Sequence, residues 1–343
     1  MLENHGWGKL SDLCDDLVVY RNLRPLDDRL PDRRVVLRKA GLSNDRTPRK
    51  VDGEYAQVAL WIAREAQKVR GASVNLQELL FIGDTLYNDG QAYRNMKKVS
   101  GWQSACFICS EALGEEPSSE VDDTDEIFCA NRWSALGAWI GRAREQGMAL
   151  DSQTLVVIDI DKTALGAKGR NDKVIDKARL EGIYRTMDAV LGDDFDRAAF
   201  ETHYAELNHA RYHPLTADNQ DYLAYVCLVI NAGLIDFDEV VSEMENGSLD
   251  NFEQFLRWVD TRMMGNPLGG ESFRQVHESV VCSVRIGDPT PFKSFRRQEF
   301  ISTVEHMGVT QDGAAVEEVI AQEITLTQEI FELARWLRSE HCL

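Results

Sequence analysis

Two aspartates, Asp159 and Asp161, follow the apolar run TLVVI inside the segment VVIDIDKTALG, residues 156–166. In an extended chain, side chains two positions apart point to the same face, so we expect both carboxylates at the carboxyl end of a parallel sheet. Such a pair binds a hard cation or shares a proton, and with magnesium one member can attack phosphorus while the other transfers protons. Thr163 adds a hydroxyl group. The simpler alternative is a strand end that carries acids in an acidic protein.

A second acidic segment, IGDTLYNDG, follows the apolar run ELLFI. Gly83 permits a tight turn, and Asp84 and Asp89 lie five positions apart in the loop that follows. Because the carboxyl ends of parallel strands meet at one edge of a sheet, this loop can face Asp159. The two segments together predict a site of oxygen ligands that suits magnesium.

These two segments resemble motifs of the haloacid dehalogenase-like hydrolases, most of which are phosphatases. VVIDIDKT is similar to the family's first motif, D-x-D-x-T, and IGDTLYND to its fourth, G-D-x-x-x-x-D. The resemblance covers residues 50–165 and the last helix. It implies that Asp159 is the nucleophile that forms an aspartyl-phosphate, that Asp161 is the acid and base, and that both join Asp84 and Asp89 around Mg²⁺. An acid at the position of Asp161 favours phosphoryl chemistry over dehalogenation.

The family's third motif is a cation upstream of the fourth motif, at the start of a helix. TPRKVDGEYAQ places Lys50 there, with Arg49 as the alternative. The order along this chain is then Lys50, Asp84, Asp159, whereas the family's first motif usually precedes the others. A circular permutation explains this order, since compact α/β domains with neighbouring termini tolerate it.

The family's second motif is a Ser or Thr at the end of the strand beside the nucleophile strand. In a permuted chain this strand should follow a helix over 327–340, yet the sequence ends at Leu343. Either the sequence is a fragment that lacks the strand, or an N-terminal segment supplies it. The candidates are DLVVYRN and RRVVLRKAGLSND, and in the second case Ser43 is the leading phosphate-binding hydroxyl.

Apolar patterning predicts the elements that must position these residues. Helical spacing is found over 54–70, 90–99 and 132–147, and short apolar runs predict strands at 78–82, 104–109 and 154–158. Strands that alternate with amphipathic helices favour an α/β fold, a Rossmann-like parallel sheet flanked by helices. We expect residues 1–169 to form the first part of this core, 170–284 an inserted α-helical cap domain, and 285–343 a return to the core. The apolar run and turn in VVCSVRIGDPTPF would begin that return.

The segment PFKSFRRQEF carries Lys293 and Arg296 among aromatic residues. We expect these cations to hold the anionic part of a substrate, and a solvated basic face is an equal alternative. Binding of nucleic acid is disfavoured, because 38 basic and 57 acidic residues give a net charge of −19.

Composition limits the class of protein. Hydrophobic residues make up 43% of the chain, but no apolar run reaches the roughly 20 residues that span a bilayer. The first residues do not resemble a signal peptide. Seven cysteines without the spacing of a disulfide framework fit reduced thiols, so we expect a cytoplasmic protein. Because no apolar run is long enough to span a bilayer, we expect no membrane partner. The resulting hypothesis is a Mg²⁺-dependent phosphatase that hydrolyses a small phosphorylated metabolite, because a cap encloses the cleft. A phosphotransferase with the same intermediate and an inactive scaffold of the same fold remain as alternatives.

Overall fold

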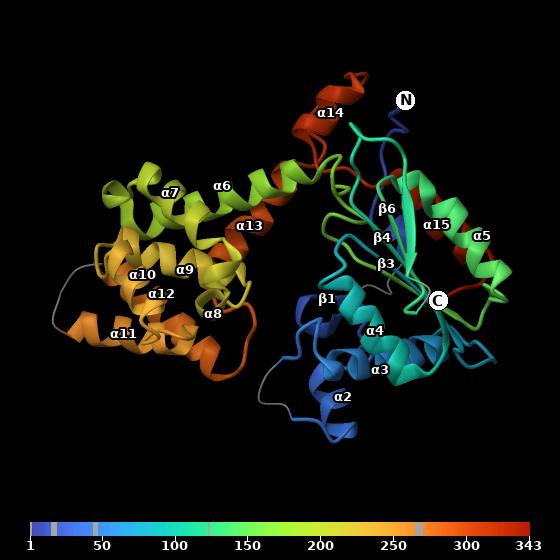
Figure 1. Ribbon diagram of the computed structural model, residues 1–343, viewed down its shortest axis with the longest axis horizontal. Coiled ribbons are helices and arrows are strands. Elements are labelled where there is room, and N and C mark those ends of the chain that lie inside the picture. The colour runs from blue at the N-terminus through green and yellow to red at the C-terminus, as the bar shows by residue number, and fades with distance from the viewer. Residues whose placement is uncertain (1, 15–18, 44–46, 123, 265–269) are drawn as a thin grey trace. The chain divides into compact units, whose positions relative to one another are not determined.

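The computed structural model describes residues 2–14, 19–43, 47–122, 124–264 and 270–343. The chain divides into two compact units (Figure 1). The first unit comprises Met1–Asp176 and His306–Leu343, and the second comprises Lys177–Glu305. The helical domain was predicted over residues 170–284, and the second unit contains 177–284 of these. The second unit also contains residues 285–305, which were predicted to return to the core.

The first unit contains a mixed sheet with the strand order β5-β6-β4-β3-β7. Its strands are β3 (Glu78–Gly83), β4 (Gln103–Cys109), β5 (Ser119–Asp122), β6 (Ile127–Ala130) and β7 (Thr154–Ile158). Among these strands β5 alone runs antiparallel to its neighbour, and β3 lies between β4 and β7 with Phe81 opposite both Cys106 and Val157. The predicted α/β fold with a largely parallel sheet is therefore confirmed, with an antiparallel edge strand in addition.

Helices cover both faces of this sheet, as Figure 1 shows. They are α3 (Gly53–Val69), α4 (Asp89–Ser100), α5 (Leu136–Glu145) and α15 (Gln328–Ser339). Alternate side chains of β3 point to opposite faces: Leu80 and Ile82 pack with α5 and α15, and Leu79 and Phe81 pack with α3 and α4. β3 is consequently buried along its whole length, which fixes the position of the loop that follows it.

Smaller elements complete the first unit. They are α1 (Ser11–Cys14), β1 (Val19–Tyr20), η1 (Arg21–Leu23), β2 (Arg24–Pro25), α2 (Arg33–Lys39), η2 (Trp133–Ala135) and α14 (Val316–Gln322). The Arg170 guanidinium pairs with Glu111 and with Glu329 of α15, and its side chain is only 11% exposed. This ion pair ties the loop after β7 to the last helix.

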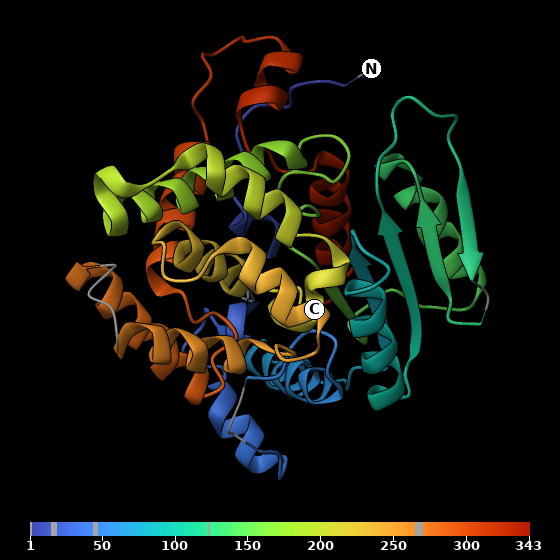
Figure 2. The ribbon, with the colours of Figure 1, turned by 60° about the vertical axis from the view of Figure 1, so that its left-hand side comes forward.

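The described residues of the second unit are helical apart from their connecting loops. α6 (Asp172–Leu191) begins in the first unit and continues into the second. The other elements are η3 (Gly192–Asp194), α7 (Arg197–Leu207), η4 (Ala210–Tyr212), α8 (His213–Thr216), α9 (Gln220–Asn231), α10 (Phe237–Glu245), α11 (Phe252–Met264), α12 (Gly270–Arg285) and α13 (Lys293–Glu305) (Figure 2). Residues Leu223–Ile230 of α9 are all buried, so this helix forms the centre of the unit's own core. Across the described part of the chain, every helix is too short or too polar to cross a bilayer.

Two local predictions were wrong, and two strands were missed. RRVVLRK forms helix α2 rather than a strand, because the Asp32 side chain caps it by accepting a hydrogen bond from the Arg34 N–H. The return to the core was expected from residue 285, but VVCSVR is the last part of α12, whose buried side chains recur at helical spacing, and residues 285–305 belong to the second unit. The strands β5 and β6 were not predicted at all, since they are short and β5 is mostly exposed.

Candidate functional site

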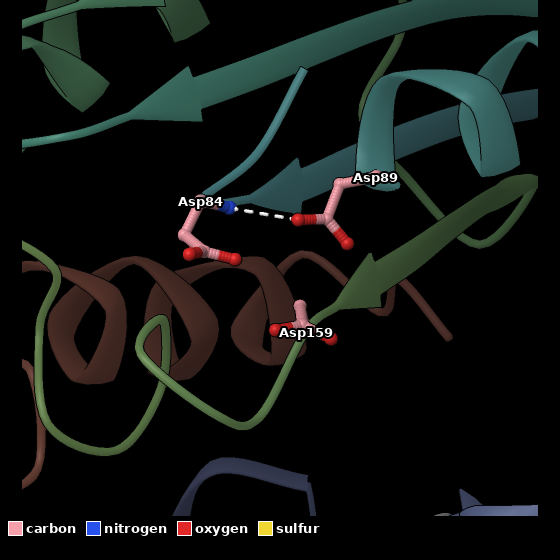
Figure 3. A group of neighbouring side chains, drawn as sticks. All are labelled: Asp84, Asp89 and Asp159. Carbon is pink, nitrogen blue, oxygen red and sulfur yellow. Dashed lines mark hydrogen bonds between the residues drawn. The ribbon is translucent and has the colours of Figure 1, made fainter. Parts of the chain in front are cut away.

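Three carboxylates converge at the carboxyl ends of two neighbouring strands. Asp84 directly follows β3, Asp89 is the first residue of α4, and Asp159 directly follows β7. The Asp159 N–H donates a hydrogen bond to the Ile82 carbonyl over 2.9 Å, so Asp159 is held in the plane of the sheet. One oxygen of each carboxylate lies within 4.8 Å of one oxygen of the others (Figure 3). The sequence prediction that the two acidic segments meet is confirmed by this geometry.

Asp89 is held in place by the turn that precedes it. Its Oδ2 accepts hydrogen bonds from the Asp84 N–H at 3.0 Å, the Thr85 N–H at 2.9 Å and the Thr85 hydroxyl at 3.0 Å. Gly83 makes this arrangement possible, because a Cβ there would lie 2.4 Å from Asp89 Cβ. Asp89 is 1% exposed, so its carboxylate has little freedom to move.

Lys50 lies in the loop before α3 and reaches the same carboxylates. Its Nζ donates hydrogen bonds to Oδ1 of Asp89 and to Oδ1 of Asp159. The backbone N–H of Arg49, the alternative cation, donates a hydrogen bond to the Asp52 side chain. Lys50 thus contacts two of the three carboxylates, those of Asp89 and Asp159.

Lys168 is a second cation in this site that sequence reasoning missed. Its Nζ donates a hydrogen bond to Oδ2 of Asp84 over 3.0 Å. The residue lies in GAKGRND, in the loop between β7 and α6. The sequence feature that could have indicated Lys168 is a lysine between small residues shortly after Asp159. It lies in the loop that follows the carboxyl end of the same strand.

The three carboxyl groups differ in proton affinity. Burial raises the pKa of Asp159 to about 7, although the Lys50 ammonium opposes this shift. Burial likewise raises the pKa of Asp84 to about 6 against the effect of Lys168. Burial would also raise the pKa of Asp89, but Lys50 and the hydrogen bonds from Thr85 outweigh it and leave that pKa below its usual value.

Asp161 does not lie where its spacing suggested. β7 ends at Ile158, and the chain then turns, with the Ala164 N–H bonded to the Asp159 carbonyl at 3.1 Å and Lys162 at a φ of +61°. Because the chain is no longer extended after Ile158, side chains two positions apart need not point to the same face. Asp161 is exposed. Among the described residues, its carboxylate is not one of the three that lie within 4.8 Å of one another.

Thr163 lies within this turn and is fully buried. Its side chain is 0% exposed, and its Oγ1 has no hydrogen-bond partner among the described residues. The Thr163 carbonyl accepts a hydrogen bond from the Thr327 hydroxyl at the start of α15. In this conformation Thr163 therefore packs inside the protein instead of lining an open crevice.

Ser43 lies outside the sheet. It is exposed and follows α2, so it does not end a strand beside β7. For the other candidate segment, DLVVYRN, residues 16–18 lie outside the described part of the chain, and Val19–Tyr20 pair with β2 in a separate small sheet. The backbone of Leu343 lies beside β7 instead: it donates to the Thr154 carbonyl at 2.9 Å and accepts from the Val156 N–H at 2.8 Å.

Lys293 and Arg296 belong to the second unit and are engaged in ion pairs there. Lys293 Nζ lies 2.6 Å from Asp288 Oδ2. Arg296 donates from Nε to Asp221 Oδ2 and from Nη1 to Glu299 Oε2, each at 2.6 Å, and Asp221 is 0% exposed. Arg296 thus neutralises buried acids within its own unit.

The donor set at the sheet edge fits a hard divalent cation. Asp84, Asp89 and Asp159 together offer carboxylate oxygens, the ligands that magnesium prefers in proteins. Lys50 and Lys168 add two positive charges that can face an anion. Comparison of the chain with family models, with curated proteins and with solved structures finds no match.

Proposed function

We propose that this protein is a Mg²⁺-dependent phosphatase of the haloacid dehalogenase type, with its motifs in circularly permuted order. The observation that carries the proposal is the bridge from Lys50 to both Asp159 and Asp89, residues that lie 109 and 39 positions away along the chain. A strand end that merely carries acids would not bring a cation and three carboxylates to one point.

The chain's own residues can perform the two halves of such a reaction. Asp159 Oδ attacks the phosphorus of a phosphate monoester and forms an aspartyl-phosphate, which water then hydrolyses. Lys50 offsets the negative charge that gathers on Asp159 and the phosphoryl oxygens. The resemblance assigns protonation of the leaving oxygen, and then the acceptance of a proton from water, to Asp161, which lies outside the carboxylate group of the described residues. Mg²⁺, held by Asp84, Asp89 and Asp159, would supply charge neutralisation of the phosphoryl oxygens.

The substrate that we propose is a small phosphorylated metabolite. The helical second unit is inserted into the chain directly after the loop that follows Asp159, as a cap over such a site would be. A phosphotransferase uses the same intermediate with another acceptor than water. Cys106, Cys109, Cys129, Cys227, Cys282 and Cys342 are free thiols, as we expect of a cytoplasmic protein, which is the location that we propose.

One observation favours a rival function. Asp161 lies outside the carboxylate group of the described residues, and the two candidate hydroxyls belong to Ser43, which is exposed outside the sheet, and to Thr163, which is fully buried. A protein of this kind that binds a metal ion without hydrolysing phosphate would tolerate both departures. The rival therefore predicts magnesium binding without turnover.

The deciding experiment measures phosphate release from an aryl phosphate and from a panel of phosphorylated metabolites, with and without Mg²⁺. We expect Asp159→Asn to abolish release, since an amide does not form the acyl phosphate. Asp28→Asn, an exposed carboxylate of the same unit, is the matched control and should leave release unchanged. A wild-type protein that releases no phosphate from any member of the panel would refute the proposal; Mg²⁺ binding without turnover would support the rival, and no Mg²⁺ binding would refute both.

A further inference from the structure

Lys168 is anchored through its backbone next to the carboxylates. Its N–H donates to the Lys162 carbonyl at 2.8 Å, and its carbonyl accepts from the Glu111 N–H at 3.0 Å and from Trp133 Nε1 at 3.3 Å. The next residue, Gly169, lies so close to Glu111 that an added Cβ would be 1.8 Å from its carbonyl oxygen. Only the side chain of Lys168 is therefore free to change position.

The two lysines of the site hold the carboxylates differently. Lys50 bridges Asp89 and Asp159, whereas Lys168 contacts one carboxylate among the described residues, that of Asp84. A divalent cation among these acids repels both ammonium groups. To move away, Lys168 breaks one ion pair, whereas Lys50 breaks two. We therefore expect the metal ion to displace the Lys168 ammonium.

The other lysine of the same loop shows that this placement is specific to Lys168. Lys162 Nζ lies 2.8 Å from Asp176 and 4.0 Å from Asp172, both at the beginning of α6. Lys162 is therefore engaged outside the carboxylate group, although it lies closer in sequence to Asp159. It provides a matched control for any change at Lys168.

We propose that Lys168 couples metal binding to phosphate binding. Without metal, Lys168 neutralises Asp84; when a divalent cation takes Asp84, the released ammonium turns to the phosphate group of the substrate. Lys168 is then a second phosphate-binding cation beside Lys50. This inference rests on the proposed function for its metal and its ligand.

Two titrations by calorimetry test it, with wild type, Lys168→Met, Lys168→Arg and Lys162→Met. The first adds Mg²⁺ alone, and the second adds inorganic phosphate at saturating Mg²⁺. We expect Lys168→Met to bind Mg²⁺ about tenfold more tightly, because a competing cation is gone, and phosphate about tenfold more weakly. Lys168→Arg should restore phosphate binding, and Lys162→Met should match wild type in both titrations. Circular dichroism confirms that each variant is folded.

The outcomes separate this inference from the proposed function. Weaker Mg²⁺ binding by Lys168→Met with unchanged phosphate affinity would mean that Lys168 only positions Asp84, and the coupling would be refuted. Normal values in both titrations would refute it as well. If the wild-type protein hydrolyses phosphate esters while Lys168→Met shows either result, the inference fails alone. If the wild-type protein binds no Mg²⁺, both fail.

Discussion

Replacement of Gly83 by alanine tests the geometry on which the carboxylate group depends. An added Cβ would lie 2.4 Å from Asp89 Cβ, 2.5 Å from its Cγ and 2.7 Å from its Oδ2, all shorter than real Cβ contacts. Asp89 begins α4, so its backbone follows only if the helix moves. The side chain must therefore rotate or the turn must open.

Either response breaks hydrogen bonds to Asp89. Three bonds from Asp84 and Thr85 reach Oδ2, and a hydrogen bond to a charged group contributes roughly 1.5–3 kcal/mol. Overpacking without such a loss costs about 1–3 kcal/mol. Because breaking the bonds relieves the overlap, the two costs do not add, and we expect Gly83→Ala to lower the free energy of unfolding by about 2–4 kcal/mol.

Urea unfolding and Mg²⁺ titration measure the effect. The midpoint of urea unfolding should fall by about 1–2 M, and Mg²⁺ affinity should fall with it because Asp89 is displaced. Gly141→Ala is the matched control: an added Cβ meets nothing within 4 Å, and alanine favours the helical conformation by about 1 kcal/mol. If Gly83→Ala unfolds at the same urea concentration as wild type and binds Mg²⁺ equally well, the described geometry of the turn is incorrect.

Two further predictions concern charge. The folded-state pKa of Asp159, about 7, exceeds the roughly 3.9 of an unperturbed aspartate, so between these two values the folded protein keeps a proton that the unfolded chain has lost. The free energy of unfolding of the metal-free wild type, compared with that of Asp159→Asn, should therefore fall as the pH rises from about 4 to about 7. Urea unfolding of both proteins in EDTA at several pH values measures this change. A difference in stability between the two proteins that stays the same at every pH would contradict it. Arg170→Met leaves the buried Glu111 unpaired and should lower the free energy of unfolding, measured in urea, by about 3 kcal/mol. The control Arg257→Met, at an exposed position, should change that free energy by less than about 0.5 kcal/mol. If the two substitutions have equal effects on stability, the ion pair of Arg170 contributes nothing.

The sequence predicted the elements that are defined by continuous or periodic burial. β3, β4 and β7 are apolar runs, buried throughout in β3, after the first residue in β4 and over the first two residues in β7. The helices α3 and α15 each present one apolar face. Their shared direction is what brings Asp84, Asp89 and Asp159 together, so the centre of the site followed from strand ends alone. These parts of the fold depend on local pattern, which a single sequence carries.

The missed features depend on where a local pattern stops or on distant contacts. RRVVLRK has an apolar centre of three residues, and its Asp32 cap distinguishes a helix from a strand. Asp161 was misplaced because the strand ends at Ile158, and such boundaries are the least certain part of any pattern. Lys168 meets a residue 84 positions away, and no periodicity connects the two.

The site's origin in three separate segments also has a consequence for folding. The contact between Lys50 and Asp159 closes a loop of 109 positions, and such long-range contacts form late because chain entropy opposes them. A chain in which β7 has not yet joined β3 has no complete set of ligands. If the protein binds Mg²⁺, the ion will select the assembled sheet and stabilise it by mass action, without assisting the earlier steps. Metal affinity then serves as a probe of the final docking of β7 during refolding.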